Sequence, residues 1–428
     1  MKIWINSITT DRTSTGVPKY SAEMADHFAR TCEVTVVAGV PHYPEWKPRA
    51  GHTNRRGVLQ QGNSTTHQFP LYLPGPERMS SRTRLMYEAS FVLNSLPFWL
   101  MRAFSSSRPD VLITVCPSLL SSLGPLLYSV FTRTPWVLHV QDLQVDAAVR
   151  LGIIRQGLFS RLLFRLEEFF LKQASFVSTI TPAMKDRIIS KGVPEDRLMV
   201  FPNWSDVSFV KPMPRMNAFR QRHGIAEDET VVLYAGNMGD KQGLDLIVEA
   251  ALQLENPAGL RFVMVGEGVS KRRLMSAVEA HGLQNFLFLP VQPLEVLPEM
   301  LAAGDIHLVV QKREAADIVM PSKLTNILAA GRSSIATADP GTTLAQVLLD
   351  HQCGLVTEPE NAAALAKAIQ TLAGDVELRT RQGLAARKYA ERHLDQTAVL
   401  DAFLNDLDNR LRARRPAALA AEILRGRK

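Results

Sequence analysis

Cysteine is scarce in this chain of 428 residues, which has only three. Cys32, Cys116 and Cys353 are far apart and form no CxxC pair. That pattern excludes a small scaffold held together by disulfides. We therefore expect a reducing, cytoplasmic compartment.

Long apolar runs are also missing. A transmembrane helix needs about 20 consecutive apolar residues, and the nearest stretch, residues 89–104, is shorter and is expected to be broken by Asn94 and Pro97. The first residues, MKIWINSITTDRTSTG, have one lysine and a short apolar run and then become polar. We expect a β-strand there and not a signal peptide, so any contact with a membrane would be peripheral.

Several motifs of well-known enzyme classes do not occur. The sequence has no GxxxxGK[ST], HExxH or GxSxG pattern, which argues against a P-loop nucleotidase, a zinc metalloprotease and an α/β-hydrolase. The segment VMVGEGVSKRRL contains Gly266 and Gly268, but Lys271 stands where a dinucleotide fingerprint has its third glycine. The dehydrogenase class is therefore disfavoured.

The charge is moderately basic. Lys and Arg number 49 against 42 Asp and Glu, a net charge of +7, so the partner is expected to be acidic: nucleic acid, an anionic membrane surface or a phosphorylated substrate. No pattern of interleaved aromatic and basic residues and no basic recognition helix indicates nucleic acid. The membrane surface and the phosphorylated substrate remain.

Arginines cluster directly before the apolar residues 89–104. The cluster consists of Arg78, Arg82 and Arg84, and the apolar stretch carries Phe91, Phe98 and Trp99. A basic segment next to apolar and aromatic side chains suits a helix in the headgroup zone of an anionic membrane. A core helix packed on a sheet fits the same residues equally well. Arg161, Arg165 and the tail RLRARRPAALAAEILRGRK are also basic, and a solvated surface would explain them too.

Short apolar strands alternate with helical stretches along the whole chain. The first series is KIWIN, EVTVVAG, VLITVC, WVLHVQD and FVSTIT; the second is TVVLYAG, LRFVMVG, FLFLP, IHLVVQ and SSIATA. Such alternation predicts parallel sheets covered on both faces. A proline-rich stretch at 201–217 separates the two series. We therefore predict two doubly wound α/β domains, at 1–205 and 206–390, followed by C-terminal helices and a basic tail at 391–428 that pack back on the first domain.

Two turns in the second half are candidates for an anion site. In LYAGNMGDKQGLDLIVEAA, three glycines lie between a strand and a helix, where backbone amides can approach a phosphate; glycines kept for steric reasons alone are the plainer interpretation. In VMPSKLTNILAAG, Lys323 stands at the start of an apolar helix. A lysine there can meet a negative charge or simply extend its ammonium to solvent.

Taken together, these segments resemble the GT-B glycosyltransferases of the large retaining family 4, and more narrowly the bacterial colanic-acid-type exopolysaccharide enzymes. The segments that carry the resemblance span nearly the whole chain: TGVPKYSAEMADHFA, PHYPEW, LHVQDLQVDAAVRLGI, PNWSD, AGNMGDKQGLD and VMPSKLTNILAAG. The resemblance implies a GT-B fold of two Rossmann-like domains facing across a cleft. The first domain would bind the acceptor, and the second would bind the nucleotide sugar.

The resemblance also implies an activity. The expected reaction is the transfer of a sugar, with retention, from a UDP- or GDP-linked donor to a lipid-linked oligosaccharide in exopolysaccharide synthesis. The acceptor would be carried by a polyprenyl diphosphate at the inner face of the cytoplasmic membrane. No metal and no other cofactor is expected. Two alternatives stay open: a GT-B nucleotide-sugar epimerase, and a non-catalytic relative in a polysaccharide assembly complex.

By the same resemblance, individual residues receive roles. Lys323 would face the leaving diphosphate, and His139 and Asp142 would act at the donor sugar or the acceptor; a buried structural role is the alternative for His139. Thr15, Tyr43 and Trp46 would lie on the acceptor side. The expected donor-binding residues are Gly16, Asn237, Met238, Gly239, Lys241, Gln242, Gly266, Pro321, Ser322 and Asn326.

The sequence departs from the family pattern at the two glutamates that many members carry with seven residues between them. Their positions are taken by Asn326, which can still bond ribose hydroxyls, and by Ile318 with Asp317 beside it. The usual arginine and lysine of the other phosphate loop fall on Asn237 and Gln242. We therefore expect the backbone amides of residues 237–239 to bind the phosphates, with Lys241 or Lys323 supplying the charge.

Overall fold

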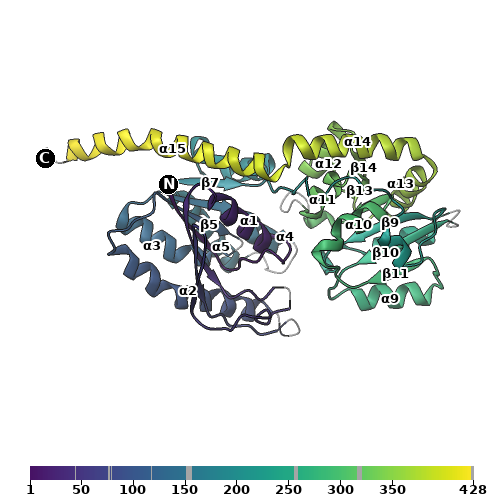
Figure 1. Ribbon diagram of the computed structural model, residues 1–428, viewed down its shortest axis with the longest axis horizontal. Coiled ribbons are helices and arrows are strands. Elements are labelled where there is room, and N and C mark those ends of the chain that lie inside the picture. Colours follow the sequence, from purple (N-terminus) through teal and green to yellow (C-terminus); the bar gives the residue numbers. More distant parts are fainter. Residues whose placement is uncertain are drawn as a thin grey trace. The chain divides into compact units, whose positions relative to one another are not determined.

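The computed structural model describes the chain except for residues 44, 76, 77, 79, 117, 151–156, 255–258, 316–320 and 426–428. Asp317 and Ile318, considered above for the first glutamate position, lie outside the described residues. The chain divides into two compact units (Figure 1). Unit 1 comprises Met1–Val145, Arg155–Pro202 and Thr397–Lys428, and unit 2 comprises Asp146–Ile154 and Asn203–Gln396.

Unit 1 is built on an eight-stranded sheet. Its strands are β1 (Lys2–Ser7), β2 (Glu33–Gly39), β3 (Gly57–Gln61), β4 (Ser64–Phe69), β5 (Val111–Cys116), β6 (Trp136–Val140), β7 (Phe176–Thr179) and β8 (Leu198–Val200). The order is β3-β4-β2-β1-β5-β6-β7-β8, and β3 alone of these strands pairs antiparallel. The central strands β5 and β6 are buried at every residue. The strand order reverses between β1 and β5, and ligands of doubly wound sheets bind beyond the carboxyl ends of the strands at such a point.

Helices cover the sheet of unit 1. They are α1 (Val17–Phe28), α2 (Ser81–Ala103), α3 (Leu123–Thr132), α4 (Gln144–Arg150, at the division between the units), α5 (Leu158–Gln173), α6 (Pro182–Ser190) and α15 (Gln396–Arg425), with 3₁₀ turns at Leu120–Ser122 and Glu195–Arg197. The long C-terminal helix α15 packs on this unit through Phe403, which stacks on Phe201 at 3.8 Å and on Phe28 at 6.2 Å. His27 bonds Asp401 at 2.7 Å beside these rings.

Unit 2 is built on six parallel strands. They are β9 (Thr230–Ala235), β10 (Leu260–Val265), β11 (Phe286–Leu289), β12 (Ile306–Val309), β13 (Ser333–Thr337) and β14 (Gly354–Thr357), in the order β11-β10-β9-β12-β13-β14. Two apolar clusters cover its faces, one around Leu233 and Leu328 and the other around Val232 and Phe262. The order reverses between β9 and β12, so a ligand crevice is expected at the carboxyl ends of these two strands.

The helices of unit 2 lie on both faces of that sheet. They are α7 (Ala218–Arg222), α8 (Asp245–Leu252), α9 (Lys271–Ala280), α10 (Leu297–Ala303), α11 (Lys323–Ala329), α12 (Thr343–Asp350), α13 (Ala362–Gly374) and α14 (Val376–His393), with 3₁₀ turns at Asp240–Gln242, Leu294–Val296 and Arg313–Ala315. The prediction of two α/β domains with parallel sheets is confirmed.

One expectation for residues 89–104 is wrong. Asn94 and Pro97 do not interrupt the helix, because α2 continues through both to Ala103. The aromatic side chains considered for the headgroup zone are in the core, with Phe91 0% exposed, Phe98 3% and Trp99 1%. A Cβ at Gly124 of α3 would lie 2.2 Å from the Trp99 ring, so glycine is needed where the two helices meet. Among the described residues, no helix combines the length and the apolar character that a bilayer crossing requires.

Candidate functional site

The strongest candidate site in unit 2 lies at the point where its strand order reverses. Strand β9 ends at Ala235 and leads into the glycine loop that begins at Gly236, while the chain leaving β12 reaches α11 at Lys323. The Lys323 Nζ lies over the Tyr234 ring, 3.7 Å from its centroid. A Cβ at Gly236 would be only 2.9 Å from the same Nζ. The lysine that the sequence placed at a helix start therefore reaches the glycine loop of the neighbouring strand.

The Lys323 ammonium is poorly compensated. Its Nζ is buried and has no hydrogen-bond partner in the part of the chain that the structure describes. Burial, together with the smaller effect of the nearby Lys241 charge, lowers the pKa of Lys323 to about 7. The Tyr234 ring compensates only in part, because a cation over an aromatic face is worth about 0.5–2 kcal/mol, whereas burying an unpaired charge is far more unfavourable. An anion that reached this Nζ would remove most of that penalty.

The glycines of the two loops are required by packing between the loops. Gly236, Gly266 and Gly268 have φ values of 150°, 146° and 153°. A Cβ at Gly266 would lie 2.0 Å from the Gly236 carbonyl oxygen, and one at Gly268 would lie 2.4 Å from the Met238 carbonyl oxygen. The close approach of the loops after β9 and β10 is thus sufficient to explain the pair that resembles a dinucleotide fingerprint. A donor contact of Gly266 stays a prediction.

The amides expected to bind the phosphates are not equivalent. The Met238 N–H donates to the Glu267 carbonyl oxygen at 2.8 Å, and the Met238 side chain is in the core at 0% exposure. The amides of Asn237 and Gly239 donate no hydrogen bond to any residue that the structure describes. Of the three predicted amides, these two remain for a ligand.

Side chains of the same loop border Gly239. A Cβ there would be 3.1 Å from the Asn237 Nδ2 and 3.1 Å from the Gln242 Oε1. The Gln242 Oε1 is buried and, within the described residues, accepts no hydrogen bond. Lys241 is exposed, and its carbonyl oxygen accepts from the Lys312 N–H at 3.1 Å. The loop therefore presents amide groups from two side chains and one exposed ammonium.

The start of α11 adds Asn326 of its first turn and the two residues before the helix, Pro321 and Ser322. The Pro321 carbonyl oxygen accepts from the Leu324 N–H at 3.0 Å, and the Ser322 carbonyl oxygen accepts from the Thr325 hydroxyl at 2.9 Å. The Asn326 Oδ1 accepts a hydrogen bond from the Ser205 hydroxyl at 2.7 Å. Since its oxygen is used, the Asn326 side chain offers its Nδ2–H groups as donors. Ser205, in the PNWSD segment, therefore orients the Asn326 side chain at this site.

The loops expected on the acceptor side meet in unit 1. Arg49 joins them: its guanidinium pairs with Asp11 at 2.8 Å and donates to the Tyr43 carbonyl oxygen at 3.1 Å. The Ser14 hydroxyl donates to the same oxygen at 3.4 Å. Thr15 and Tyr43 are thereby brought to one place, beyond the carboxyl ends of β1 and β2. Sequence reasoning missed Arg49 and Asp11, although an Asp two residues before Thr13 is a recognisable turn signal.

Gly16 and Trp46 have unusual backbone conformations in these loops. Gly16 precedes α1 with φ 67°, and a Cβ there would meet nothing within 4 Å, so its conformation and not crowding requires glycine. Trp46 has φ 55° and packs against His42 at 5.4 Å and Tyr87 at 5.2 Å. Of these three rings only Trp46 is partly exposed, since His42 and Tyr87 are buried beneath it at 1% and 7% exposure.

His139 lies in the core and not on an open surface. Its side chain is 2% exposed in β6, with Nδ1 3.0 Å from the Ser178 Oγ and Nε2 2.8 Å from the Gln141 Nε2. Because the Gln141 amide donates, Nε2 accepts and Nδ1 carries the proton. Burial lowers the pKa of His139 to about 3, although the bond with Ser178 opposes this shift. A direct bond from His139 to a sugar would require one of these two bonds to break.

Asp142 follows β6 and is half-buried. It lies near Cys116, the last residue of β5, whose pKa is raised by burial and by the charges of Glu167, Glu88 and Asp142. Burial also raises the pKa of Glu88. Three carboxyl groups therefore gather near the carboxyl ends of β5 and β6. Within the described residues, no group of three or more His, Cys, Asp or Glu side chains is arranged to hold a metal ion.

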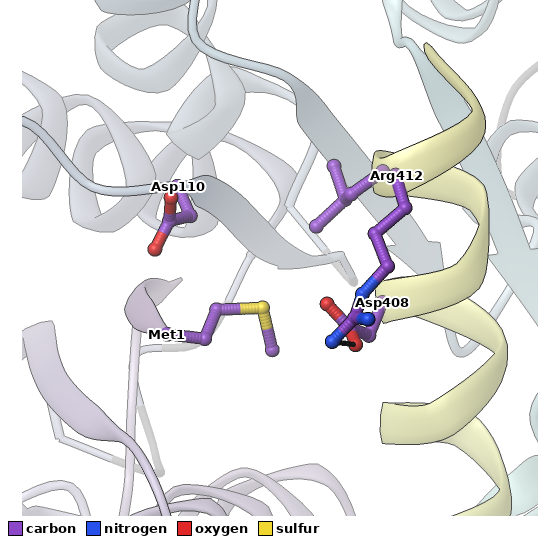
Figure 2. A pocket seen from close by; sticks show the side chains of 5 residues that line it. Met1, Asp110, Asp408 and Arg412 are labelled. Atoms are coloured by element: carbon purple, nitrogen blue, oxygen red, sulfur yellow. Dashed lines mark ion pairs between the residues drawn. The ribbon is translucent and has the colours of Figure 1, made fainter. Parts of the chain in front are cut away.

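A separate hollow of about 350 Å³ is lined by Met1, Asp110, Asp408, Leu411 and Arg412 (Figure 2). Asp408 and Arg412 of α15 form an ion pair at 2.8 Å. Met1 precedes β1 and Asp110 precedes β5, so this hollow lies at the amino ends of the strands. That is the opposite edge of the sheet from the one where ligands of this fold class bind.

Comparisons with known proteins agree with this geometry. Residues 15–204 match the family described as glycosyl transferase 4-like domain, and residues 216–389 match glycosyl transferases group 1. The chain is 36% identical to the putative colanic acid biosynthesis glycosyl transferase WcaI of Escherichia coli (strain K12), over 95% of this chain and 100% of that protein.

Solved structures show the same fold at low sequence identity. Sucrose-phosphate synthase from Thermosynechococcus elongatus superposes with a TM-score of 0.75 at 18% identity, covering 96% of this chain and 99% of that one. Anabaena HepE in complex with UDP-glucose gives 0.71 at 17% identity, covering 96% and 100%. The identity to WcaI over nearly the whole length shows the family: the chain is a glycosyltransferase of the family 4 type with a GT-B fold.

Proposed function

We propose that this glycosyltransferase takes its sugar from a UDP- or GDP-linked donor bound in unit 2. The buried, unpartnered Nζ of Lys323 carries the proposal. It stands where an anion would be stabilised most, between the glycine loop after β9 and the start of α11. HepE, a structural neighbour, was solved with UDP-glucose, which supports a nucleotide sugar as donor. Asn237, Gly239, Lys241 and Gln242 would surround the diphosphate, and the Asn326 Nδ2 would bond the ribose.

The proposed chemistry proceeds with retention. The acceptor hydroxyl attacks the anomeric carbon on the face from which the diphosphate leaves, and a diphosphate oxygen takes the hydroxyl proton. The Lys323 ammonium offsets the charge that develops on the leaving group, a contribution that typically amounts to a hundredfold or more in rate. No carboxylate nucleophile and no metal is required. His139 acts as a positioning residue that orients Gln141, and Asp142 orients the acceptor or the donor sugar.

The proposed acceptor is a saccharide carried on a polyprenyl diphosphate, in the synthesis of an exopolysaccharide at the inner face of the cytoplasmic membrane. WcaI, the relative in Escherichia coli, is named for colanic acid biosynthesis, which supports this pathway class. Thr15, Tyr43 and Trp46 would contact the acceptor saccharide, because the partly exposed rings of Tyr43 and Trp46 suit the apolar face of a sugar. Gly16 lets the backbone approach both substrates.

A screen of nucleotide sugars tests the donor. The correct donor at about 100 times its dissociation constant should stabilise the protein by about 2.7 kcal/mol, and in the presence of a saccharide acceptor it should release nucleoside diphosphate. An isomerised donor would indicate an epimerase. No stabilisation by any UDP- or GDP-sugar would contradict the proposal and favour a non-catalytic relative.

A further inference from the structure

Helix α2 is apolar on both sides. Its inner side packs Tyr87, Phe91, Phe98 and Trp99 into the core of unit 1. The outer side of α2 is nevertheless exposed, with Phe104 directly after the helix exposed to 93% and Leu93 to 70%. The outer side therefore has a use other than core packing.

The neighbouring helix α3 extends this exposed surface. The two helices pack against each other where Trp99 meets Gly124 (Figure 1), and Val130 and Phe131 of α3 are 61% and 68% exposed. We call the exposed apolar side chains of both helices the α2–α3 face; it consists of Leu85, Met86, Leu93, Leu100, Met101, Phe104, Leu123, Val130 and Phe131. Large exposed apolar surfaces mark interaction sites.

The charges around the α2–α3 face are mostly positive. Between Ser81 and Thr134 the sequence has five arginines, at 82, 84, 102, 108 and 133, against two acids. Glu88, whose side chain is 13% exposed, offsets Arg84 by pairing with it, and Asp110 accepts from the Lys2 amide at 2.9 Å, so positive charge still predominates in this stretch. Residues 123–132 of α3 contain no charged side chain. An apolar face with a basic border complements a surface that is apolar within and anionic at its boundary.

We propose that the α2–α3 face seats unit 1 on a bilayer containing anionic lipid, with the apolar side chains among the acyl chains and the arginines at the headgroups. A second copy of the chain is a poorer occupant, because a symmetric contact would place the arginine borders of two copies against each other. The α2–α3 face and the proposed function have in common only the expectation of a membrane-borne acceptor. The exposure and the charge of the residues in and around the face support the membrane contact independently of the donor site.

Vesicle flotation tests the proposal with the full chain. The protein should float with vesicles of phosphatidylglycerol and phosphatidylcholine at low salt, less so at high salt because charges are screened beyond about 8 Å at physiological ionic strength, and far less with phosphatidylcholine alone. The triple variant Leu93→Gln, Met101→Gln, Phe104→Gln should bind at least about tenfold more weakly, since three inserting side chains are lost. Arg78→Glu, Arg82→Glu, Arg84→Glu should weaken binding and reduce its salt dependence.

The matched control changes equally exposed apolar residues of unit 2: Leu349→Gln, Val376→Gln, Leu384→Gln. This variant should float like the wild type. The proposal is overturned if the wild type stays in solution at low salt, if the α2–α3 variant floats as well as the control, or if sedimentation shows a dimer that only the α2–α3 variant abolishes. Nucleotide-sugar binding, measured without vesicles, should be the same in all variants. Its loss in the wild type would count against the proposed function and not against this surface.

Discussion

Two buried basic side chains, one in each unit, differ in whether the protein already satisfies them. His139 of unit 1 has both ring nitrogens bonded, to Ser178 and Gln141. Lys323 of unit 2 has a buried Nζ with no hydrogen-bond partner among the described residues. Burial lowers the pKa of each, His139 to about 3 and Lys323 to about 7.

The difference indicates what each residue does. A satisfied buried group holds its own unit together, because its removal leaves partners unpaired. An unsatisfied one weakens the fold unless a ligand completes it, and such groups gather at functional sites. We infer that unit 2 holds its charge ready for an anion. We propose that recognition by unit 1 depends on the loops that Arg49 joins and on the partly exposed Trp46 ring.

The largest expected effect comes from removing the unsatisfied ammonium. Lys323→Met keeps the apolar stem over Tyr234 but removes the charge, so turnover of the donor should fall by about a hundredfold or more while the unfolding free energy stays the same or rises. Steady-state kinetics and thermal unfolding measure the two quantities. The control is Lys367→Met on α13, an exposed lysine of the same unit. Turnover similar in both variants would remove Lys323 from the site.

A smaller effect is expected from crowding the same ammonium. Gly236→Ala adds a Cβ 2.9 Å from the Lys323 Nζ at φ 150°, and donor affinity should drop by about tenfold as the ammonium is displaced. Gly282→Ala is the control for backbone strain, because Gly282 also has a positive φ but a Cβ there would meet nothing within 4 Å. Calorimetric titration measures the donor affinity of both variants. Equal affinities would argue against the position assigned to Lys323.

The third prediction concerns the ribose contact. Asn326→Ala removes the side chain that Ser205 orients at 2.7 Å, and the Michaelis constant for the donor should rise about fivefold, as expected for one hydrogen bond of about 1 kcal/mol. Saturated turnover should change less. Ser205→Ala should give a weaker change in the same direction. A Michaelis constant that does not move in either variant would contradict the assignment.

The smallest effect on turnover is expected at the satisfied residue. His139→Gln should lower turnover by about threefold at most and destabilise the protein by about 1–3 kcal/mol, because Ser178 or Gln141 loses its partner.

The pH dependence of stability tests whether His139 is a buried, neutral residue of the core. The folded pKa of about 3 lies below the unfolded value of about 6.5. Between these values the unfolded chain binds a proton that the folded chain does not, so stability falls as the pH falls through this window. His139→Gln should remove that contribution in denaturant titrations. A loss of turnover as large as that of Lys323→Met would instead assign His139 a direct catalytic role.

Strong local signals in the sequence predicted most of the fold. All ten apolar runs became strands, because continuous apolar residues are what a sheet covered on both faces requires. Four strands were missed. The exposed β3 and the half-polar β4 lack an apolar run, β8 has only three residues, and β14 has only Leu355 and Val356 as adjacent large apolar residues.

The site was less predictable, because its contacts join distant segments. The sequence placed Lys323 at a helix start but could not show that Tyr234 and Gly236 lie next to it. The bond between Ser205 and Asn326 spans 121 positions. The Gly266 and Gly268 pair resembles a phosphate motif, and the structure explains it by backbone packing. The sequence of α2 could not show which apolar side chains face the core and which face outward, because large apolar residues lie on both sides of the helix.

Calorimetric titration with a nucleotide sugar across a range of pH shows whether the Lys323 ammonium meets the donor diphosphate. A donor that binds the protonated lysine should bind tightly below pH 7. Above the pKa of about 7, binding must take up a proton, so affinity should fall by up to tenfold for each pH unit, and the observed heat should vary with the buffer. Lys323→Met should bind more weakly at neutral pH and show neither dependence. Equal affinity of wild type and Lys323→Met, both independent of pH between about 6 and about 8.5, would contradict the account.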